Sequence, residues 1–165
     1  MFKFRSSIYK KRDGLVSSKL FDQNSFYPAF IADATGATRT IIIESPFIGQ
    51  RRLIRLLPVL ESAVLRGVKV IVNTRNPVVH DGIMQVHSTN GITRLQAIGA
   101  TVLYTGGHHR KLAIIDDSIL YEGSLNILSQ NDSCEVMRRI DSVDLTEQMI
   151  KFTSLGQWYT KGNNE

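Results

Sequence analysis

The chain has 165 residues, of which 42% are hydrophobic, and this length and composition fit one globular domain with a sizeable core. The 20 Lys and Arg residues outnumber the 15 Asp and Glu residues, which favours a polyanionic partner only weakly. The single cysteine, Cys134, excludes an internal disulfide framework and an all-cysteine zinc site, and the spacing of the histidines argues against a structural metal.

The two ends of the chain are polar. We expect residues 1–19 to form a basic segment outside the fold, residues 20–158 to form one domain, and residues 159–165 to form a polar tail. The first residues carry no apolar run long enough for a signal peptide, and no stretch reaches the roughly 20 apolar residues of a membrane span. The sequence therefore predicts a cytoplasmic protein without a membrane partner.

The first half of the domain alternates helical and strand patterns. Apolar residues at helical spacing predict a helix at about 25–36, and the apolar run at 39–44 predicts a buried strand. A second helical stripe covers about 50–66, where Pro58 should kink or split the helix. The apolar run at 68–73 is the next strand. Strand, helix and strand in this order indicate a parallel βαβ unit.

The second half adds a helix at about 82–98, a strand at 101–104, and a hairpin of 111–115 and 119–122 that turns at 116–118. A further strand is expected at 134–140. The last helix begins after Ser142 and has an apolar face of Leu145, Met149 and Phe152. The whole pattern predicts an α/β fold with a mixed, largely parallel central sheet flanked by helices on both faces.

The most specific feature of the sequence is the pattern His-x-Lys-x4-Asp-x6-Gly-Ser-x-Asn in the second half, formed by His109, Lys111, Asp116, Gly123, Ser124 and Asn126. Residues two apart on a strand point to the same face, so the predicted strand presents His109 and Lys111 together. Imidazole is neutral and basic near pH 7, which makes His109 a candidate nucleophile, while Lys111 can neutralise a phosphate oxygen. These groups suit the cleavage of a phosphodiester without a metal.

Further residues complete the predicted site. Asn126 offers an amide donor and Ser124 a hydroxyl to the phosphate, and Gly123 lets the backbone approach closely. A nucleophilic histidine needs its second ring nitrogen held by a carboxylate, and Glu135 opens the next strand, so we assign it this role. Arg75 follows the second strand at the edge where α/β sheets place their sites. Contact with substrate and no such contact are equally open for this residue.

Four other residues allow two interpretations each. Asp116 ends the strand that carries Lys111, five residues on, and bracing the hairpin turn explains it better than contact with substrate. Arg51 and Arg55 share one face of a helix, and an ordinary solvated surface explains them better than contact with a phosphate backbone. Glu44 ends the first strand, where a site contact and a turn position are both open.

The predicted chemistry lacks one component, because the histidine that attacks cannot also be the acid in the same step. The chain holds one such set of residues, and the adjacent His108 points the opposite way on a regular strand. A two-fold dimer supplies the missing acid, since it places two copies of His109 face to face. We therefore expect a homodimer with one composite site, a phosphohistidine intermediate and no cofactor.

The motif resembles the signature of the phospholipase D superfamily, and weaker similarity extends over residues 39–140. The order of elements is similar to that of single-motif bacterial nucleases of this superfamily, which act as metal-free homodimers through a phosphohistidine. It is also similar to phospholipase-D-like domains of some bacterial helicases and restriction proteins. The resemblance implies that His109 is nucleophile and acid, that Lys111, Ser124 and Asn126 bind phosphate, and that Glu135 is the partner of His109.

The sequence as a whole predicts a metal-independent phosphodiesterase, an endonuclease that acts on DNA as a homodimer, with a helicase or restriction protein as a further partner. The first alternative is a non-catalytic nucleic-acid-binding module of a larger repair or restriction system. The intact His109, Lys111 and Asn126 favour catalysis over this alternative. A phospholipase ranks last, because the chain shows no amphipathic insertion for a membrane surface.

Overall fold

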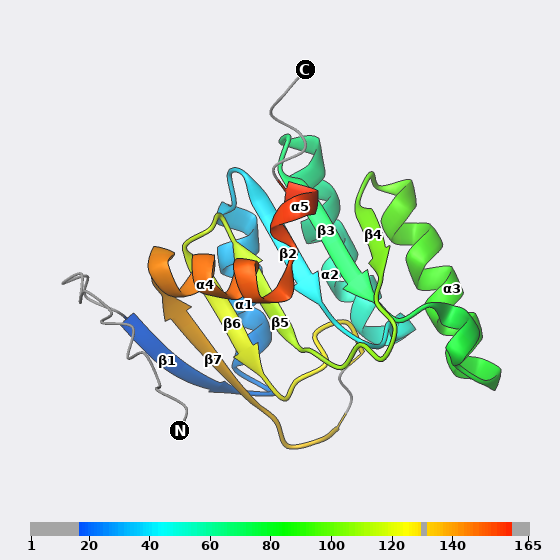
Figure 1. Ribbon diagram of the computed structural model, residues 1–165. Coiled ribbons are helices and arrows are strands. Elements are labelled where there is room, and N and C mark those ends of the chain that lie inside the picture. The colour runs from blue at the N-terminus through cyan, green and yellow to red at the C-terminus, as the bar shows by residue number, and fades with distance from the viewer. Residues whose placement is uncertain (1–16, 130–131, 160–165) are drawn as a thin grey trace, which may run out of the picture.

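The computed structural model describes residues 17–129 and 132–159 (Figure 1), so most of the expected basic segment and the tail lie outside the described residues. The strands in these ranges are β1 (Ser17–Asp22), β2 (Thr40–Glu44), β3 (Lys69–Thr74), β4 (Thr101–Tyr104), β5 (Leu112–Ile115), β6 (Ile119–Gly123) and β7 (Val136–Asp141). The helices are α1 (Phe26–Gly36), α2 (Gln50–Leu65), the 3-10 helix η1 (Pro77–Val79), α3 (Gly82–Ala97), α4 (Val143–Thr153) and α5 (Gly156–Tyr159).

The strands form one mixed sheet in the order β1-β7-β6-β5-β2-β3-β4. The pairs β2–β3 and β3–β4 are parallel, and the other neighbouring pairs of described strands are antiparallel. The expectation of a mixed α/β sheet is confirmed, but the expectation that the sheet is largely parallel is wrong. The reason lies in the second half, where the tight turn at 116–118 joins β5 to β6, since a connection this short joins antiparallel strands.

The parallel part of the sheet positions the start of β5. β2, α2 and β3 form the predicted parallel βαβ unit, and α3 leads on to β4 in the same direction. The connection between β4 and β5, residues 105–111, stays at the carboxyl edge of these strands, and β5 then pairs antiparallel with β2, with Leu112 opposite Glu44. The start of β5 therefore lies beside the ends of β2 and β3 (Figure 1).

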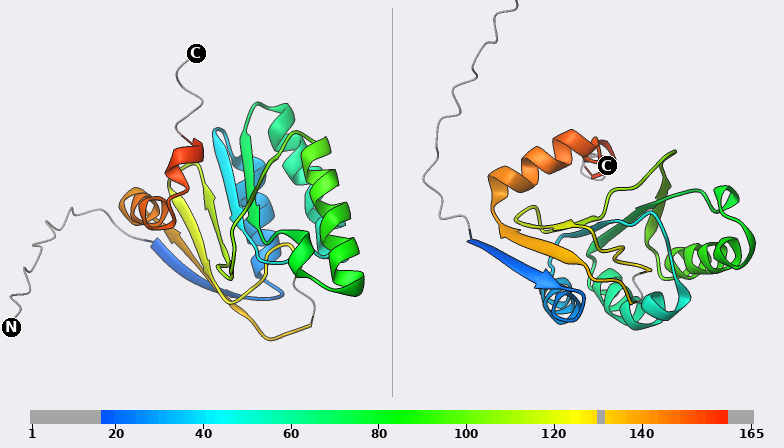
Figure 2. Two further views of the ribbon diagram at one scale, coloured as in Figure 1. Left: turned by 45° about the vertical axis from the view of Figure 1, so that its right-hand side comes forward. Right: turned by 90° about the horizontal axis from the view of Figure 1, so that it is seen from below.

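Helices cover both faces of the sheet, as predicted (Figure 2). α1, α2 and α3 pack on one face, where Leu56 and Leu95 share a buried core with Ile41. The chain after β7 packs on the other face, where Leu155 shares a second core with Ile42. Consecutive residues of β2 thus alternate between the two cores, and every residue of this strand is buried, which explains its continuous apolar run.

The first strand corrects the expected boundary of the domain. β1 begins at Ser17 and pairs antiparallel with β7, so residues 17–19 belong to the sheet and not to a basic segment outside it. Most side chains of β1 are exposed, and Phe21 is the one that packs against the core. Backbone hydrogen bonds hold this edge strand, so its side chains need not alternate between apolar and polar, and the sequence shows little strand periodicity there.

Two helices also differ from expectation. α2 is one helix and is not split at Pro58, which is exposed, so water can satisfy the carbonyl that proline leaves unpaired. The apolar face predicted for the last helix is confirmed only at Met149, which packs against the second core; Phe152 is 80% exposed and Leu145 is also exposed, whereas Thr146 and Thr153 are buried. The hydroxyl of each threonine donates to a backbone carbonyl four residues earlier, and these bonds allow burial.

Candidate active site

The motif residues gather at the sheet edge where β2 and β3 end and β5 begins. Glu44 is the last residue of β2, and Arg75 follows the last residue of β3. Lys111 directly precedes β5, and its carbonyl accepts a hydrogen bond from the Gly123 amide in β6 at 3.3 Å. Segments that are distant in the sequence thus meet at the carboxyl edge of the parallel strands, where α/β sheets usually place their sites.

His109 and Lys111 lie side by side in the segment that leads into β5. The Lys111 Nζ lies 3.0 Å from Nδ1 of His109 and donates to the His109 carbonyl oxygen at 2.8 Å. Both residues precede β5, so the prediction that a regular strand carries them is wrong. The two side chains nevertheless come together, and His109 is exposed, which leaves its imidazole open to an approaching ester.

The charge of Lys111 depends on its surroundings. Burial lowers the pKa of Lys111, the Glu135 carboxylate raises it, and the positive charge of Arg75 lowers it, with a net result below the usual value. Arg75 and Glu135 are therefore both within electrostatic reach of the lysine. An ammonium group in such a position gains from an added negative charge, and a phosphate oxygen supplies one.

Arg110, between the two motif residues, is anchored in the protein interior. Its guanidinium donates two hydrogen bonds to the Glu44 carboxylate, one of them from Nη2 to Oε1 at 2.7 Å. Glu44 is fully buried, and its Oε1 also accepts from the Asn73 side-chain amide at 2.8 Å. The buried carboxylate is thus both paired and hydrogen-bonded, as burial of a charge requires. The pair fixes the segment that carries His109 and Lys111 to the ends of β2 and β3.

Arg75 holds the segment of His109 and Lys111 by a contact with the preceding residue, His108. The Arg75 Nε donates to the His108 carbonyl oxygen at 2.6 Å, and the guanidinium carbon lies 5.1 Å from the centre of the Phe47 ring. The His108 imidazole is buried, unlike that of His109, and this burial lowers the pKa of His108. Arg75 therefore contacts the backbone of the motif segment and adds positive charge near Lys111.

Ser124 and Glu135 are hydrogen-bonded to each other across the connection between β6 and β7. The Ser124 hydroxyl donates to Oε2 of Glu135, and its oxygen accepts from the Val136 amide at 3.1 Å. The other carboxylate oxygen of Glu135 accepts from the Ser133 hydroxyl at 2.6 Å. Within residues 17–129 and 132–159, no hydrogen bond joins Glu135 to His109, so the role of Glu135 as the partner of the histidine stays a prediction.

The two residues assigned to structural support lie in different places. A Cβ atom at Gly123 would lie 2.1 Å from the Val136 carbonyl oxygen, so β7 approaches β6 at a distance that only glycine allows. Asp116 lies at the far end of β5, where its carboxylate accepts from the backbone amides of residues 38, 39 and 40 at 2.8–2.9 Å. Asp116 thus braces the hairpin turn against the start of β2, away from His109.

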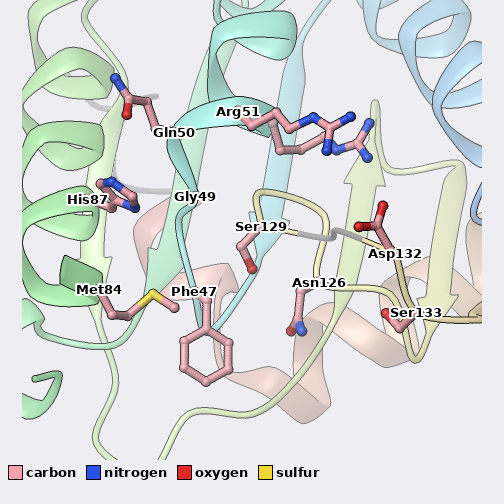
Figure 3. Close-up of a pocket in the computed structure, with 11 residues that line it drawn as sticks. Phe47, Gly49, Gln50, Arg51, Met84, His87, Asn126, Ser129, Asp132 and Ser133 are labelled. Atoms are coloured by element: carbon pink, nitrogen blue, oxygen red, sulfur yellow. The ribbon is translucent and has the colours of Figure 1, made fainter. Parts of the chain in front are cut away.

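Asn126 lines a cavity of about 660 Å³ beside the motif (Figure 3). The cavity lies between the connection that follows β6 and the segment that joins β2 to α2, and Phe47, Arg51 and Ser129 also line it. The Oδ1 atom of Asn126 is buried and has no hydrogen-bond partner among the described residues. An unpaired buried amide oxygen costs free energy.

The structure therefore brings His109, Lys111 and Arg75 together, pairs Ser124 with Glu135, and places Asp116 elsewhere. Sequence reasoning missed Arg110. Arg110 lies between two side chains that share a face, so its own side chain points the other way, toward the interior. An arginine in that position needs a buried acidic partner, and Glu44 at the end of an apolar strand is such a partner.

Two further findings concern only the described part of the chain. In these residues, no three His, Cys, Asp or Glu side chains are grouped so that they could hold a metal ion. None of the helices in the described ranges has the length and apolar character that crossing a bilayer requires.

The fold and this site define a class of protein. A family model described as "Cardiolipin synthase, PLD-like domain" matches residues 30–155. This match spans most of the chain, including the motif from His109 to Asn126 and the other candidate site residues Arg75 and Glu135, so the chain belongs to this phospholipase D-like family. The resemblance found in the sequence is thereby confirmed.

Solved structures share the fold at low sequence identity. Nuc from Salmonella typhimurium, a phospholipase D family member, matches with a TM-score of 0.67 and 17% identity over 83% of this chain and 91% of its own. NucT from Helicobacter pylori matches with a TM-score of 0.64 and 21% identity over 88% of this chain and 96% of its own. The archaeal chromatin protein TrmBL2 matches with a TM-score of 0.59 and 13% identity over 88% of this chain and 53% of its own. No curated protein matched the sequence.

Proposed function

We propose that the chain is a metal-independent phosphodiesterase, an endonuclease that cleaves DNA through a phosphohistidine intermediate. The observation that carries this proposal is the pair of His109 and Lys111, whose side-chain nitrogens lie 3.0 Å apart at an exposed sheet edge. An exposed imidazole is a competent nucleophile, and the adjacent ammonium group neutralises an oxygen of the phosphate that the imidazole attacks. Membership of the phospholipase D-like family supports the same chemistry.

The reaction has two displacement steps. In the first, a ring nitrogen of His109 forms a bond to phosphorus, and the bond from phosphorus to the leaving oxygen breaks while an acid protonates that oxygen. In the second, water attacks the phosphohistidine, gives its proton to the conjugate base of that acid, and releases His109. Lys111, Ser124 and Asn126 stabilise the negative charge on the non-bridging oxygens in both steps.

The acid in this proposal comes from a second copy of the chain. His108 is the nearest imidazole in sequence, but it is buried and its pKa is lowered, so it is neutral and shielded at pH 7. A partner subunit related by a two-fold axis would place its own His109 on the opposite side of the scissile phosphate. The two imidazoles would then share one proton cycle and titrate as a coupled pair.

Glu135 is proposed to orient the imidazole of His109 in the assembled site. Its effect on the pKa of Lys111 supports a position close to the motif. In the chain by itself, the Glu135 carboxylate is held by Ser124 and Ser133, so contact with His109 requires a change of side-chain rotamer. A carboxylate on the second ring nitrogen would set the tautomer and raise the basicity of the attacking nitrogen.

DNA is the proposed substrate for two reasons. The chain carries a net charge of +5, which favours a polyanion, and TrmBL2, which shares the fold, binds DNA. The likeness to TrmBL2 also favours a second candidate function, a DNA-binding module without catalysis, in which the motif side chains would only hold phosphate. A helicase or restriction protein as a further partner stays a prediction.

The test uses the purified full chain in EDTA with bis-p-nitrophenyl phosphate, plasmid, a single-stranded oligonucleotide, RNA and phosphatidylcholine vesicles. We expect ester and DNA hydrolysis in EDTA, none from His109→Asn, and a loss of about 10²–10³-fold in Lys111→Ala. Lys151→Ala, which removes an exposed lysine on α4, is the matched control. DNA binding without hydrolysis would establish the second candidate, and a complete loss of cleavage in EDTA would refute the metal-free mechanism.

The composite site has a separate test. Wild-type chain and His109→Asn are mixed in varying proportions at constant total chain concentration under conditions of subunit exchange, and hydrolysis is measured relative to the same concentration of wild type. If both imidazoles are needed, mixed dimers are inactive, and an equal mixture retains about one quarter of the activity because only one dimer in four is wild type. A retention of one half would show that each chain works alone.

A further inference from the structure

Three arginines occupy the first turns of α2, where they are electrostatically unfavourable. Arg51 and Arg55 are exposed, Arg52 is half-buried, and the first turn of the helix contains no acidic residue. The amino end of a helix carries a partial positive charge that favours anions, and like charges four residues apart repel each other. Burial lowers the pKa of Arg52, and the charges of Arg55 and Arg51 contribute to this lowering. The repulsion would be relieved by an anionic ligand.

Two hollows meet at these arginines. The cavity that contains Asn126 is lined by Arg51 and Arg52, and a second hollow of about 470 Å³ is lined by the same two residues together with Arg55 and Tyr27. Figure 3 shows the first hollow, with Asn126 on one wall and Arg51 above it. The two hollows share Arg51, Arg52 and Asp132 in their linings, so they adjoin at the start of α2. We call the two adjoining hollows the trough; Asn126 of the motif lines its first part, and Tyr27 at the start of α1 lines its second part.

The cations of the trough differ in how they are held. The guanidinium carbon of Arg52 lies 3.7 Å from the centre of the Tyr27 ring, so this arginine is fixed against the floor of the trough. Arg51 and Arg55 are exposed, and neither forms an ion pair with any residue in the described ranges. Among the described residues that line the two hollows, Arg51, Arg52 and Arg55 are cationic and Asp132 carries a carboxylate. An anion with several charges in a row matches this pattern.

We infer that the trough binds the sugar–phosphate backbone of the substrate strand on one side of the scissile phosphate. This inference rests on the proposed function, because the trough begins at Asn126 of the motif. Residues 51 and 55 lie one helical turn apart, about 6 Å along the helix axis, so each arginine can contact a different phosphate of the same strand. Contacts of this kind give affinity without base specificity and depend strongly on salt.

The experiment compares Arg51→Gln/Arg55→Gln with the control Lys19→Gln/Lys151→Gln, which removes two positive charges from β1 and α4. Binding of a fluorescent single-stranded oligonucleotide is measured at several salt concentrations in a His109→Asn background. We expect the arginine variant to weaken binding at least tenfold and to reduce the slope of log K against log salt by about 1.4, at 0.7 for each lost phosphate contact. In the lysine control, we expect the loss of binding and the change in slope each to be less than half of those in the arginine variant.

Hydrolysis of bis-p-nitrophenyl phosphate separates this inference from the proposed function. The small ester has no further phosphates that could contact Arg51 and Arg55, so the arginine variant with His109 restored should hydrolyse it within about twofold of the wild type while cleaving the oligonucleotide more slowly. Equal losses on both substrates, or equal weakening of binding by the lysine control, would overturn the trough. If the wild type hydrolyses nothing, the proposed function fails, and the salt slopes still decide whether the trough binds nucleic acid.

Discussion

Arg110 and Glu44 form an ion pair that holds the segment of His109 and Lys111 to the end of β2. Glu44 is fully buried, while the Arg110 side chain reaches it from a partly exposed position. His109 and Lys111 lie on either side of Arg110 and precede the regular part of β5, so the strand ladder alone does not fix them. The ion pair adds this fixation, together with the hydrogen bond from Arg75 to the His108 carbonyl oxygen, and the two motif side chains lie 3.0 Å apart on the segment so held.

Removal of the guanidinium should destabilise the protein strongly. We expect Arg110→Ala to lower the free energy of unfolding by about 3–5 kcal/mol, because it leaves the Glu44 carboxylate buried without its counter-charge. Urea denaturation monitored by circular dichroism measures the change. Lys151→Ala, which breaks the exposed pair with Glu147, serves as the control and should cost less than about 1 kcal/mol. Similar losses in the two variants would contradict the role of the buried pair.

Loss of the Asp116 carboxylate should affect stability more than catalysis. Burial opposes ionisation of Asp116, but hydrogen bonds from the backbone of residues 38–40 outweigh it, so the pKa of Asp116 lies below its usual value. Its contribution is therefore present above the unfolded pKa near 3.9 and is lost as the pH falls through the lower folded pKa. We expect Asp116→Ala to cost about 1–3 kcal/mol in urea denaturation at pH 7. A loss of kcat at a temperature where the variant stays folded would assign Asp116 to the chemistry instead.

His108 should make the fold sensitive to mild acid. Burial lowers the pKa of His108 in the folded chain, so near pH 6 the unfolded chain binds more protons than the folded one. The free energy of unfolding therefore falls as the pH drops below the unfolded pKa of about 6.5. Denaturation curves at pH 7.5 and 5.5 should show a larger loss for the wild type than for His108→Gln, which cannot titrate. Parallel losses would mean that His108 is not the group responsible.

Glu135→Gln should separate catalysis from folding. If the carboxylate orients His109 in the assembled site, the variant should lose about 10–100-fold in kcat on bis-p-nitrophenyl phosphate with little change in KM. Ser133→Ala removes the other hydrogen bond to Glu135 and serves as the matched control, with kcat expected near the wild-type value. Full kcat in Glu135→Gln would restrict Glu135 to holding Ser124 in place.

The parallel part of the fold could be predicted because its signals are local and strong. The isoleucine run at 41–43 is typical of a fully buried strand. The stripe around Leu53 and Leu60 has the spacing of a helix. β1 could not be found in this way, since pairing of its backbone with β7 leaves its side chains exposed. The direction of β5 depends on how the connection at 105–111 runs, which no side-chain pattern encodes.

The candidate site could also be predicted only in part. The characteristic spacing of the motif identified His109 and Lys111, although both residues precede β5 and are not part of a strand. Arg110 was missed because its partner, Glu44, is 66 residues away and its burial depends on the packing of β2 against β5. The assignment of Glu135 follows sequence order, whereas its hydrogen bonds depend on the conformation of the connection between β6 and β7.

Direct detection of the covalent intermediate tests the account most sharply. The full chain is incubated with bis-p-nitrophenyl phosphate in EDTA, quenched in alkali to preserve phosphohistidine, digested, and mapped by mass spectrometry. We predict a burst of one p-nitrophenolate per active site and a p-nitrophenyl phosphate adduct on His109 that disappears on longer incubation. Steady hydrolysis with an unmodified His109, or an adduct on any other residue, would contradict the mechanism.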